Sequence, residues 1–565
     1  MTNNKQKLEL TWIGKNNPEY DIANIEPRIL EEKPELSNCV NDPNTENMII
    51  HGDNLLALKA LLPEYEGKIK CVYIDPPYNT GNAFEHYDDS VEHSTWLSLM
   101  KPRLELLRML LTEEGVISIH IDDIEYCYLK VLLDEVFGRD SFINTIAIRD
   151  SHPSGLKLAS KDKKIIKTKS YIVIYKKSST TTINPIYQSR SEWDIHYSTY
   201  VDIDSKDLKK RTLKEVLLEQ NIIDPKYSIN ETSLRNKDFR KFVFDNRHKV
   251  FQSTKEMPDT ARKLSIENRD KVIEYDSNGE RGFAYNGRRL FPLSKSIQDV
   301  GIDGEVDKED FGKLLCDFWD DIDFNNSQNE GDVQFPASKK PEYLLGRILT
   351  MFSAKGEYVL DSFLGSGTTV AVAHKMGRKY IGIEMGEHAY THCKVRLDKV
   401  IDGTDQGGIS NVIEWKGGGG YKFYELAPSF IVKDEFGNPV IDSFYNDTKL
   451  IKAMCKLMNF TYQPSQTEYW KHGVGQGKNY LYITTQLLTS GMIQQIAGHL
   501  IEGESLIICP KKFEPGADKI DGRITIKKIP QSILKSCHFG KKEYLLPIKE
   551  RTMRELETDE EEDIE

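Results

Sequence analysis

The chain has 565 residues, and 39% of them are apolar, which is enough for roughly three or four separately folded domains. It contains no apolar run of 18 residues and no apolar signal-peptide core in its first ten residues, so we expect no membrane span. Its eight cysteines include no C-x-x-C pair, which excludes the common zinc and disulfide frameworks and favours a cytoplasmic location.

The net charge of −12 argues against a protein that is coated with nucleic-acid-binding charge. The charge is unevenly distributed, because residues 151–300 hold 30 Lys and Arg against 20 Asp and Glu. This basic middle is a candidate phosphate-facing segment, although lysines are also ordinary surface residues. The acidic residues 548–565 predict a solvated tail.

The first predicted elements lie between residues 47 and 74. Residues 1–46 are polar and predict a loosely folded N-terminal extension. A short strand at 47–50 is followed by Asp53 and an apolar helix at 55–62, and Asp53 suits the N-cap of that helix. The apolar run IKCVYI at 69–74 then predicts a buried strand.

Asp75-Pro76-Pro77-Tyr78 follows that strand directly. The two prolines lack backbone N–H groups and fix their own φ angles, so the strand must end in a stiff loop. A carboxylate before the prolines and an aromatic ring after them can hold one flat polar group between an acceptor and a ring face. An ordinary strand-to-turn transition with a surface tyrosine is the simpler alternative.

This tetrapeptide resembles the catalytic motif of amino-group DNA methyltransferases, which move a methyl group from S-adenosylmethionine to an exocyclic base nitrogen. The resemblance implies that the Asp75 carboxylate and the Pro76 carbonyl bind the amino hydrogens and stabilise developing positive charge. It also implies that Tyr78 stacks on a base flipped out of the duplex. The acidic residue that matches Asp53 lies beside the cofactor's adenine in this family. No metal is required.

The next elements predict an α/β domain. A polar loop at 81–94, long enough to close over a flipped base, is followed by a helix at 95–111 and a strand at 115–121. A helix at 126–137 and two strands at 142–148 and 170–175 complete the pattern. We therefore expect a mostly parallel sheet with one antiparallel edge over residues 47–178.

Residues 179–334 lose the strand–helix alternation. Basic residues lie among aromatic ones there, and Arg281, Arg288 and Arg289 cluster near glycines. Arginine can bind phosphate or the guanine edge, so these three residues are candidate DNA contacts. The methyltransferases carry a variable target-recognition region in this place, and the resemblance assigns it here by order alone.

A second motif follows at residues 335–405. A strand at 357–361 leads through a glycine-rich turn at 362–369 into a helix, and a strand at 380–384 ends in Glu384. Glycines let the backbone approach a ligand closely, and a terminal carboxylate can bind two ribose hydroxyls, so a side chain at Gly367 should enter the ligand's space. The absence of Gly-Lys-Ser/Thr disfavours a Walker A site. The resemblance to the methyltransferases implies that Phe335 and Lys340 flank the S-adenosylmethionine. The other residues expected at this cofactor are Asp53, Asp361, Phe363, Gly365, Ser366, Gly367, Thr368 and Glu384.

The order of the two motifs, with the catalytic one first, resembles the circularly permuted β group of these enzymes. It implies one split Rossmann-like domain, 47–178 plus 335–405, in which the strand before Asp75 and the strand before Phe363 are neighbours. The resemblance implies adenine-N6 as the target, because Asp rather than Ser precedes Pro-Pro-Tyr. Cytosine-N4 and a DNA-binding targeting subunit with vestigial catalysis remain alternatives.

Gly417 to Gly420 predict a linker or a tight turn, and residues 421–547 predict a separate α/β domain. This region resembles the C-terminal part of the methylation subunits of Type III restriction-modification systems. The resemblance implies double-stranded DNA as substrate, a homodimer, and an ATP-dependent restriction (helicase-nuclease) subunit as partner.

Overall fold

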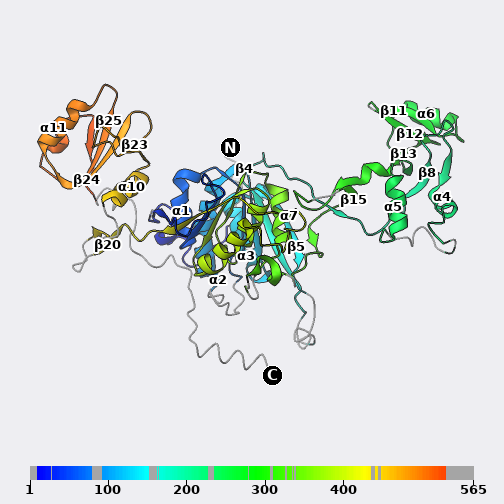
Figure 1. Cartoon of the computed structure of the whole chain (residues 1–565), viewed down its shortest axis with the longest axis horizontal. Coiled ribbons are helices and arrows are strands. Elements are labelled where there is room, and N and C mark those ends of the chain that lie inside the picture. The colour runs from blue at the N-terminus through cyan, green and yellow to red at the C-terminus, as the bar shows by residue number, and fades with distance from the viewer. Residues whose placement is uncertain are drawn as a thin grey trace, which may run out of the picture. The chain divides into compact units, whose positions relative to one another are not determined.

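The computed structural model describes residues 9–529, except 27, 79–91, 152–161, 163–164, 225, 227–233, 278, 306–308, 325–326, 334, 336–338, 434–438 and 443–446. The chain divides into two compact units (Figure 1). One unit contains residues 1–184 and 317–565, and the second, 185–316, is inserted into it. The predicted acidic tail and most of the predicted loop at 81–94 lie outside the described residues.

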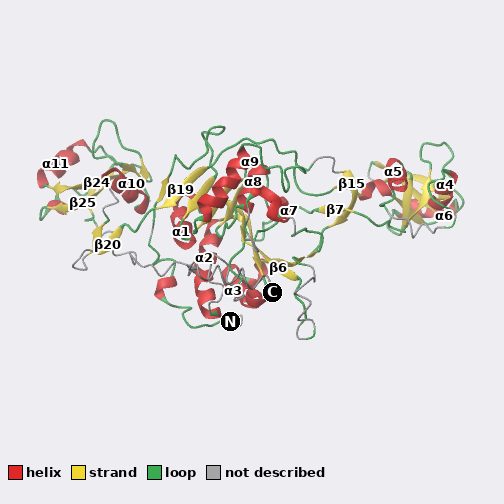
Figure 2. Cartoon of the chain, turned by 60° about the horizontal axis from the view of Figure 1, so that its bottom comes forward, coloured by secondary structure: helices red, strands yellow, loops and turns green. Residues whose placement is uncertain are grey.

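The first unit is built on a ten-stranded sheet (Figure 2). Its order is β1 (Leu30–Glu32), β19 (Lys422–Leu426), β2 (Met48–His51), β18 (Lys379–Glu384), β17 (Tyr358–Asp361), β3 (Ile69–Ile74), β4 (Leu111–Ile121), β6 (Lys169–Lys176), β5 (Phe142–Arg149), β16 (Phe318–Trp319). The strands from β19 to β4 are parallel, and β6 runs antiparallel between β4 and β5. The predicted α/β class is therefore confirmed, and so is the predicted pairing of β3 with β17.

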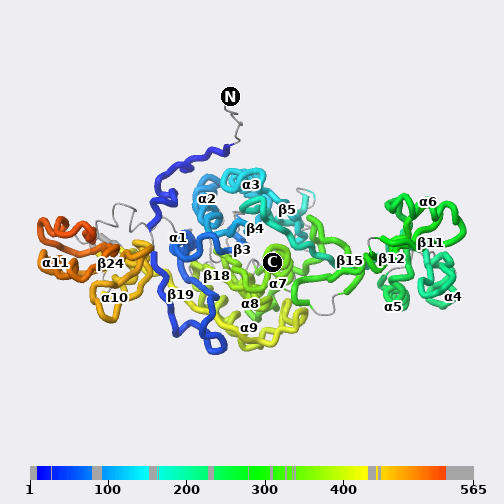
Figure 3. Tube along the Cα trace, turned by 90° about the horizontal axis from the view of Figure 1, so that it is seen from above, coloured from blue at the N-terminus to red at the C-terminus, as the bar shows by residue number. Residues whose placement is uncertain are grey.

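Helices cover both faces of this sheet, which is why its central strands are apolar on both sides. One layer contains α1 (Asn54–Tyr65), α2 (His93–Leu110) and α3 (Asp123–Phe137). The opposite layer contains α7 (Glu342–Phe352), α8 (Thr368–Lys375) and α9 (Val395–Ile401) (Figure 3). The π-helical turn η7 (Ala389–Lys394) leads directly into α9.

Two expected boundaries of the first unit are wrong. Residues 1–46 are not uniformly loose, because β1 pairs with β19 in antiparallel register, with Leu30 opposite Leu426. A boundary at 421 would remove β19, which pairs in parallel with β2. Strands of three and five residues are too short to show a period on their own, so only their pairing identifies them.

The four glycines before β19 form a packed turn rather than a linker. The Gly418 carbonyl accepts a hydrogen bond from His374 at 2.8 Å, and its N–H donates to Ile401 at 2.8 Å. A Cβ at Gly419 would lie 2.6 Å from the His374 ring, and Gly419 has a φ of +80°. Glycine is required there because the chain passes this close to a buried ring.

The inserted unit has its own antiparallel fold. Its six-stranded sheet has the order β11 (Ile273–Ser277), β12 (Glu280–Tyr285), β13 (Arg288–Pro292), β10 (Val250–Thr254), β8 (Tyr197–Val201), β9 (Lys210–Thr212). A three-stranded sheet contains β14 (Ile297–Asp299), β15 (Glu309–Leu314) and β7 (Tyr187–Ser189), and the helices are α4 (Leu213–Glu219), α5 (Lys237–Asp245) and α6 (Asp259–Glu267). Residues 317–334, expected with this region, belong to the first unit, because β16 pairs with β5.

The C-terminal part of the first unit carries a further five-stranded sheet. Its strands are β22 (Thr461–Tyr462), β23 (Gly473–Val474), β24 (Asn479–Leu488), β25 (Ser505–Phe513) and β26 (Ile524–Ile526). They are accompanied by α10 (Asp447–Leu457), α11 (Ser490–His499) and the hairpin β20 (Ile431–Lys433) with β21 (Pro439–Ile441). In the described part of the chain, no helix combines the length and apolar character that crossing a membrane requires.

Candidate active site

The two sequence motifs meet at the carboxyl ends of adjacent parallel strands. Asp75 follows β3, and the glycine-rich turn follows β17, whose Leu360 lies opposite Val72. The chain leaves β3 towards β4 on one side and leaves β17 towards β18 on the other. This divergence is the topological switch point, where open α/β sheets bind their ligands.

Both carboxylate oxygens of Asp75 are occupied. The Tyr78 hydroxyl donates a hydrogen bond to Oδ1 at 2.6 Å, and the Lys340 ammonium forms an ion pair with Oδ2. The Lys340 Nζ also lies 5.2 Å from the centre of the Tyr78 ring. Burial, followed by the Asp75 charge, raises the pKa of Tyr78 well above its usual value, so its hydroxyl stays protonated as the donor.

The loop that carries these groups is fixed to the neighbouring helix. The Pro77 carbonyl accepts a hydrogen bond from the indole N–H of Trp96 at 2.9 Å. Trp96 is 3% exposed and lies in the first turn of α2. The Pro-Pro stiffness expected from the sequence is therefore reinforced by a tertiary hydrogen bond.

The uncharged ring of His120 packs next to this loop. Its Nδ1 lies 3.0 Å from the Tyr73 hydroxyl, its Nε2 lies 2.8 Å from the Ser170 hydroxyl, and its ring centre is 6.0 Å from that of Tyr78. Burial, with the nearby Lys340 charge, lowers the pKa of His120 to about 3. The ring is therefore uncharged at neutral pH and acts as a packed, hydrogen-bonded side chain.

Asp361 holds the glycine-rich turn together through two hydrogen bonds. Its Oδ1 accepts from the Phe363 N–H at 2.9 Å, and its Oδ2 accepts from the Thr369 hydroxyl at 2.5 Å. Asp361 is 2% exposed, and this burial raises the pKa of its carboxyl group to about 7. The two hydrogen bonds have the opposite effect and lower the pKa. Asp361 therefore shapes the turn through its acceptors, and the Phe363 side chain is itself mostly buried.

Glu384 lies across the same turn at the end of β18. Its two oxygens accept from the Gly365 N–H at 2.7 Å and the Gly386 N–H at 2.9 Å. Its Oε1 also lies 3.8 Å from the His388 Nδ1. The expected ribose contact stays a prediction.

The two glycines of the turn differ in what surrounds them. A Cβ at Gly365, where φ is +54°, would lie 3.7 Å from the Phe335 ring, which is an ordinary contact. A Cβ at Gly367, where φ is +78°, would lie 3.1 Å from the Cys393 Cα in η7. The space at Gly367 is thus filled by the protein backbone, which contradicts the expectation that a ligand fills it.

Ser366 and Thr368 are engaged within the protein. Their hydroxyls lie 3.1 Å apart, and the Thr368 hydroxyl accepts from the Arg396 guanidinium at 2.8 Å. Arg396 also pairs with Glu342 at 2.8 Å, and Lys375 pairs with the same carboxylate. These three charged side chains are almost fully buried, so they fix the start of α8 against α7 and α9.

Asp53 is an N-cap, as its position predicted. Its Oδ1 accepts from the Leu56 N–H at 3.0 Å, and its other oxygen pairs with buried Arg103 at 3.2 Å. The preceding Gly52 donates to the Glu384 carbonyl at 3.0 Å, so Asp53 lies beside the end of β18. The next residue, Asn54, donates to the Ser362 carbonyl at 2.7 Å, which ties α1 to the glycine-rich turn.

The three arginines proposed as DNA contacts do not form one patch. Arg281 pairs with Glu274 through two hydrogen bonds, at 2.8 and 2.9 Å. Arg288 and Arg289 are consecutive on β13 and therefore point to opposite faces of the sheet. Arg289 lies over the Phe291 ring at 5.4 Å, and Arg288 is exposed.

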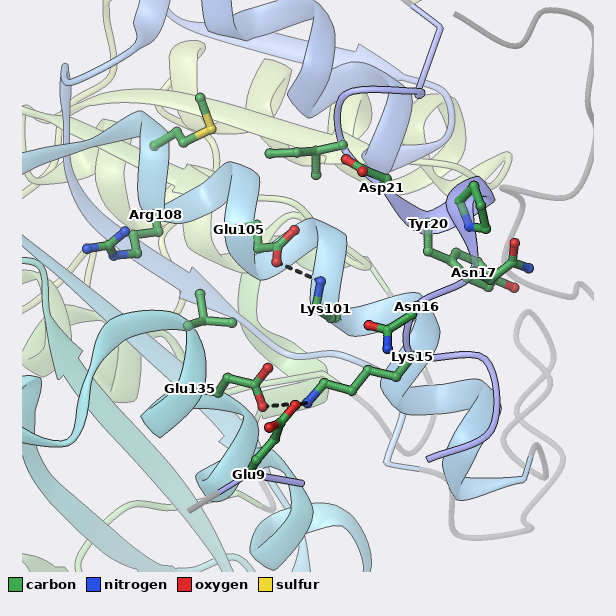
Figure 4. A pocket seen from close by; sticks show the side chains of 14 residues that line it. Glu9, Lys15, Asn16, Asn17, Tyr20, Asp21, Lys101, Glu105, Arg108 and Glu135 are labelled. Carbon is green, nitrogen blue, oxygen red and sulfur yellow. Dashed lines mark hydrogen bonds and ion pairs between the residues drawn. The ribbon is translucent and has the colours of Figure 1, made fainter. Parts of the chain in front are cut away.

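A cavity of about 780 Å³ lies away from the motifs (Figure 4). Its walls are the segment 9–22 and the later turns of α2 and α3, and they carry both signs of charge. Lys15 pairs with Glu9 and Glu135, and Lys101 pairs with Glu105. Within the described residues, no cluster of His, Cys, Asp and Glu has an arrangement that could hold a metal ion.

Sequence reasoning did not identify several groups that hold this site. Trp96, Arg103 and Glu342 lie on helices far along the chain from the residues they fix, so no local pattern marks them. Lys340 was assigned to the cofactor, but its ammonium lies on Asp75. Its position before a proline and a helix start fixes its backbone but not the direction of its side chain.

Comparison with known proteins agrees with this arrangement. Residues 69–394 match the DNA methylase family. The chain is 37% identical over 410 residues to the HindVI Mod subunit of a type III restriction-modification enzyme from Haemophilus influenzae, covering 68% of this chain and 54% of that protein. It is 24% identical over 507 residues to the EcoP15I Mod subunit of Escherichia coli, covering 76% and 73%, and 30% identical over 345 residues to the type II methyltransferase M.EcaI of Enterobacter cloacae, covering 60% and 66%. The chain thus spans about half the length of the HindVI relative. Because the family match covers more than half of the sequence and includes both motifs, this chain belongs to the DNA methylase family.

Proposed function

We propose that this chain transfers a methyl group from S-adenosylmethionine to the N6 amino group of adenine in double-stranded DNA. The observation that carries the proposal is the placement of Asp75-Pro76-Pro77-Tyr78 and the glycine-rich turn at the ends of two adjacent parallel strands. A base at the first motif and a cofactor at the second would therefore share one crevice.

The residues of the turn fit an adenosyl cofactor. The Phe335 ring lies beside Gly365, and the buried Glu384 carboxylate at the end of β18 is a group of the kind that binds ribose hydroxyls. Asp53 lies beside the same strand end. When bound there, S-adenosylmethionine would supply the methyl group.

Asp75 and Pro76 would act on the amino group itself. An exocyclic amine is a weak nucleophile, because its lone pair is delocalised into the base. Acceptance of its two hydrogens by the Asp75 carboxylate and the Pro76 carbonyl favours a nitrogen whose lone pair is directed at the methyl donor. The ring of Tyr78 would stack on the base and orient it.

The assignment to adenine rests on Asp before Pro-Pro-Tyr and on the Mod subunits among the relatives. Cytosine-N4 is the alternative within the same chemistry. Mass spectrometry of nucleosides from treated DNA separates the two, because N6-methyladenine supports the proposal and N4-methylcytosine replaces it.

The proposed partners are those that the resemblance to the methylation subunits of Type III systems implies. We infer that the chain is a modification and specificity subunit, that unit 185–316 reads the DNA sequence, and that the protein forms a homodimer which also binds an ATP-dependent restriction subunit. Light scattering on the full chain tests the dimer. A monodisperse monomer that methylates DNA at micromolar concentration would contradict it.

The central test is Asp75→Ala, with Asp140→Ala as the control. Asp140 is an exposed carboxylate just before β5, at the opposite edge of the sheet. Asp75→Ala should abolish methyl transfer and preserve S-adenosylmethionine binding in calorimetry, whereas Asp140→Ala should retain both. Full activity of Asp75→Ala would refute the assignment. Failure of the folded wild-type protein to bind the cofactor would favour a targeting subunit with vestigial catalysis.

A further inference from the structure

We propose that Lys340 is a positioning residue that holds the Asp75 carboxylate throughout the reaction, and that the Tyr78 hydroxyl occupies the place of the target amino group until the base arrives. This inference rests on the proposed function, because it concerns how the same carboxylate receives its substrate. It removes Lys340 from the cofactor and assigns it to the catalytic motif.

The starting observation is that Asp75 has a different donor on each oxygen. The neutral Tyr78 hydroxyl lies on Oδ1 at 2.6 Å, and the charged Lys340 ammonium lies on Oδ2. The target amine must also donate to this carboxylate. Each oxygen has a second acceptor position, so displacement is not forced by the count of acceptors; in this proposal the base replaces one of the two present donors because the amine must reach the carboxylate and the Pro76 carbonyl together.

Lys340 is held in place from both sides along the chain. The Lys339 ammonium donates to the backbone carbonyls of Gln328 at 3.3 Å, Val333 at 2.6 Å and Glu330. After Pro341, buried Glu342 pairs with Lys375 and Arg396 at 2.8 Å. The backbone of Lys340 is therefore fixed, and its side chain is only 13% exposed.

The charge of Lys340 also opposes its departure. Breaking the charge-assisted contact between Lys340 and Asp75 costs more than breaking the ordinary hydrogen bond of a neutral hydroxyl. The two donors are therefore not equivalent. The exchange should take place at Oδ1, and Lys340 should stay on Oδ2.

Tyr78 is suited to give up its hydrogen bond. Its hydroxyl donates to Asp75 three residues earlier, so a rotation of the ring is enough to break the contact. The incoming amino group then donates to the vacated Oδ1 and to the Pro76 carbonyl. The same rotation frees the ring face to stack on the base, which couples base entry to the release of the carboxylate.

The test uses Lys340→Met and Lys340→Arg, with Lys355→Met as the control at an exposed lysine after α7. Lys340→Met should lower kcat about a hundredfold, the size expected for losing one charged group that orients the reacting centre. Its Kd for S-adenosylmethionine should stay within about threefold of wild type, because the ammonium contacts Asp75 and not the cofactor. Lys340→Arg should recover part of kcat, and Lys355→Met should match wild type.

Tyr78→Phe tests the proposal that the Tyr78 hydroxyl occupies the place of the target amino group. It keeps the ring and removes only the competing hydroxyl, so duplexes with 2-aminopurine at the target position should bind about threefold more tightly and show stronger flipped-base fluorescence. Weaker flipping by Tyr78→Phe would overturn the placeholder role. Cofactor binding at least tenfold weaker in Lys340→Met, with kcat unchanged at saturation, would return Lys340 to the cofactor. Absence of methyl transfer by the wild-type protein would instead refute the proposed function.

Discussion

The two glycines of the cofactor turn offer a matched pair of alanine substitutions. Both have positive φ, +54° at Gly365 and +78° at Gly367, so each alanine loses about 1–2 kcal/mol for a left-handed conformation. At Gly367 the new methyl group also lies 3.1 Å from the Cys393 Cα. Overpacking against backbone costs about 1–3 kcal/mol more, which brings the expected loss for Gly367→Ala to roughly 2–5 kcal/mol.

Gly365→Ala should behave differently. Its methyl group would lie 3.7 Å from the Phe335 ring, within the space that the cofactor is expected to use. The fold should therefore lose only the backbone term, whereas S-adenosylmethionine should bind more weakly. Urea unfolding followed by intrinsic fluorescence measures the first quantity, and calorimetry measures the second. Equal stability of the two variants would show that the contact with η7 does not decide the role of Gly367.

Three further predictions follow from the site. Glu384→Gln should weaken S-adenosylmethionine binding about tenfold in calorimetry, since hydrogen bonds to charged groups contribute about 1.5–3 kcal/mol, and exposed Glu387→Gln should not. The pKa of Asp361 is raised from 3.8 to about 7. Between pH 4 and pH 7 the folded protein therefore binds one more proton than the unfolded chain. The free energy of unfolding should fall by about 4 kcal/mol as the pH rises through this range. Asp361→Asn should flatten that slope in urea titrations, and an unchanged slope would reject this cause. Exchange of residues 185–316 with those of a relative should move sequence specificity and leave the chemistry intact; a chimera that keeps its original target site would place recognition elsewhere.

The central sheet could be predicted because its signals are local. The strand predicted at 69–74 is observed as β3, and its pairing with β17 was implied by the order of the two motifs at their ends. The antiparallel sheet of unit 185–316 was missed, because its strands are short and have buried residues on both faces, as Val250 and Phe251 do. Periodicity fails for such strands.

In the site, too, local sequence signals predict some features, whereas contacts between distant residues cannot be predicted. The positions of Asp53 at a helix start and of Glu384 at a strand end could be predicted from the sequence, and their contacts with the cofactor stay predictions. The partner of Lys340 could not be assigned, since 265 positions separate it from Asp75 and only the folded sheet brings them together. The Gly367 expectation failed for the same reason, because η7 occupies the space beside it.

The division into two units also changes the interpretation of the basic segment at residues 151–300. Residues 151–184 hold 8 Lys and Arg against 1 Asp and Glu, whereas unit 185–316 holds 24 of each. The positive excess therefore belongs largely to the first unit. Sequence recognition by the inserted unit would have to depend on local groups such as Arg288 and not on its net charge.

Part of that excess lies on the catalytic edge of the sheet. Lys169 begins β6 opposite Arg149, and Tyr171 lies opposite Ile121, the last residue of β4. Lys169 is exposed, and its Nζ lies 4.9 Å from the centre of the Tyr171 ring. A DNA backbone that delivers a base to Asp75 must pass this edge, so we expect Lys169 to contact a phosphate.

Lys169→Glu and Lys176→Glu test this expectation within one strand. Lys176 ends β6 opposite Val116, at the edge of the sheet away from Asp75. Lys169→Glu should weaken DNA binding and reduce the slope of log K against log salt by about 0.9, the value for one lost phosphate contact. Lys176→Glu changes the net charge equally and should leave the slope unchanged. If both variants shift the slope by the same amount, the effect is one of total charge, and the catalytic edge has no specific phosphate contact at Lys169.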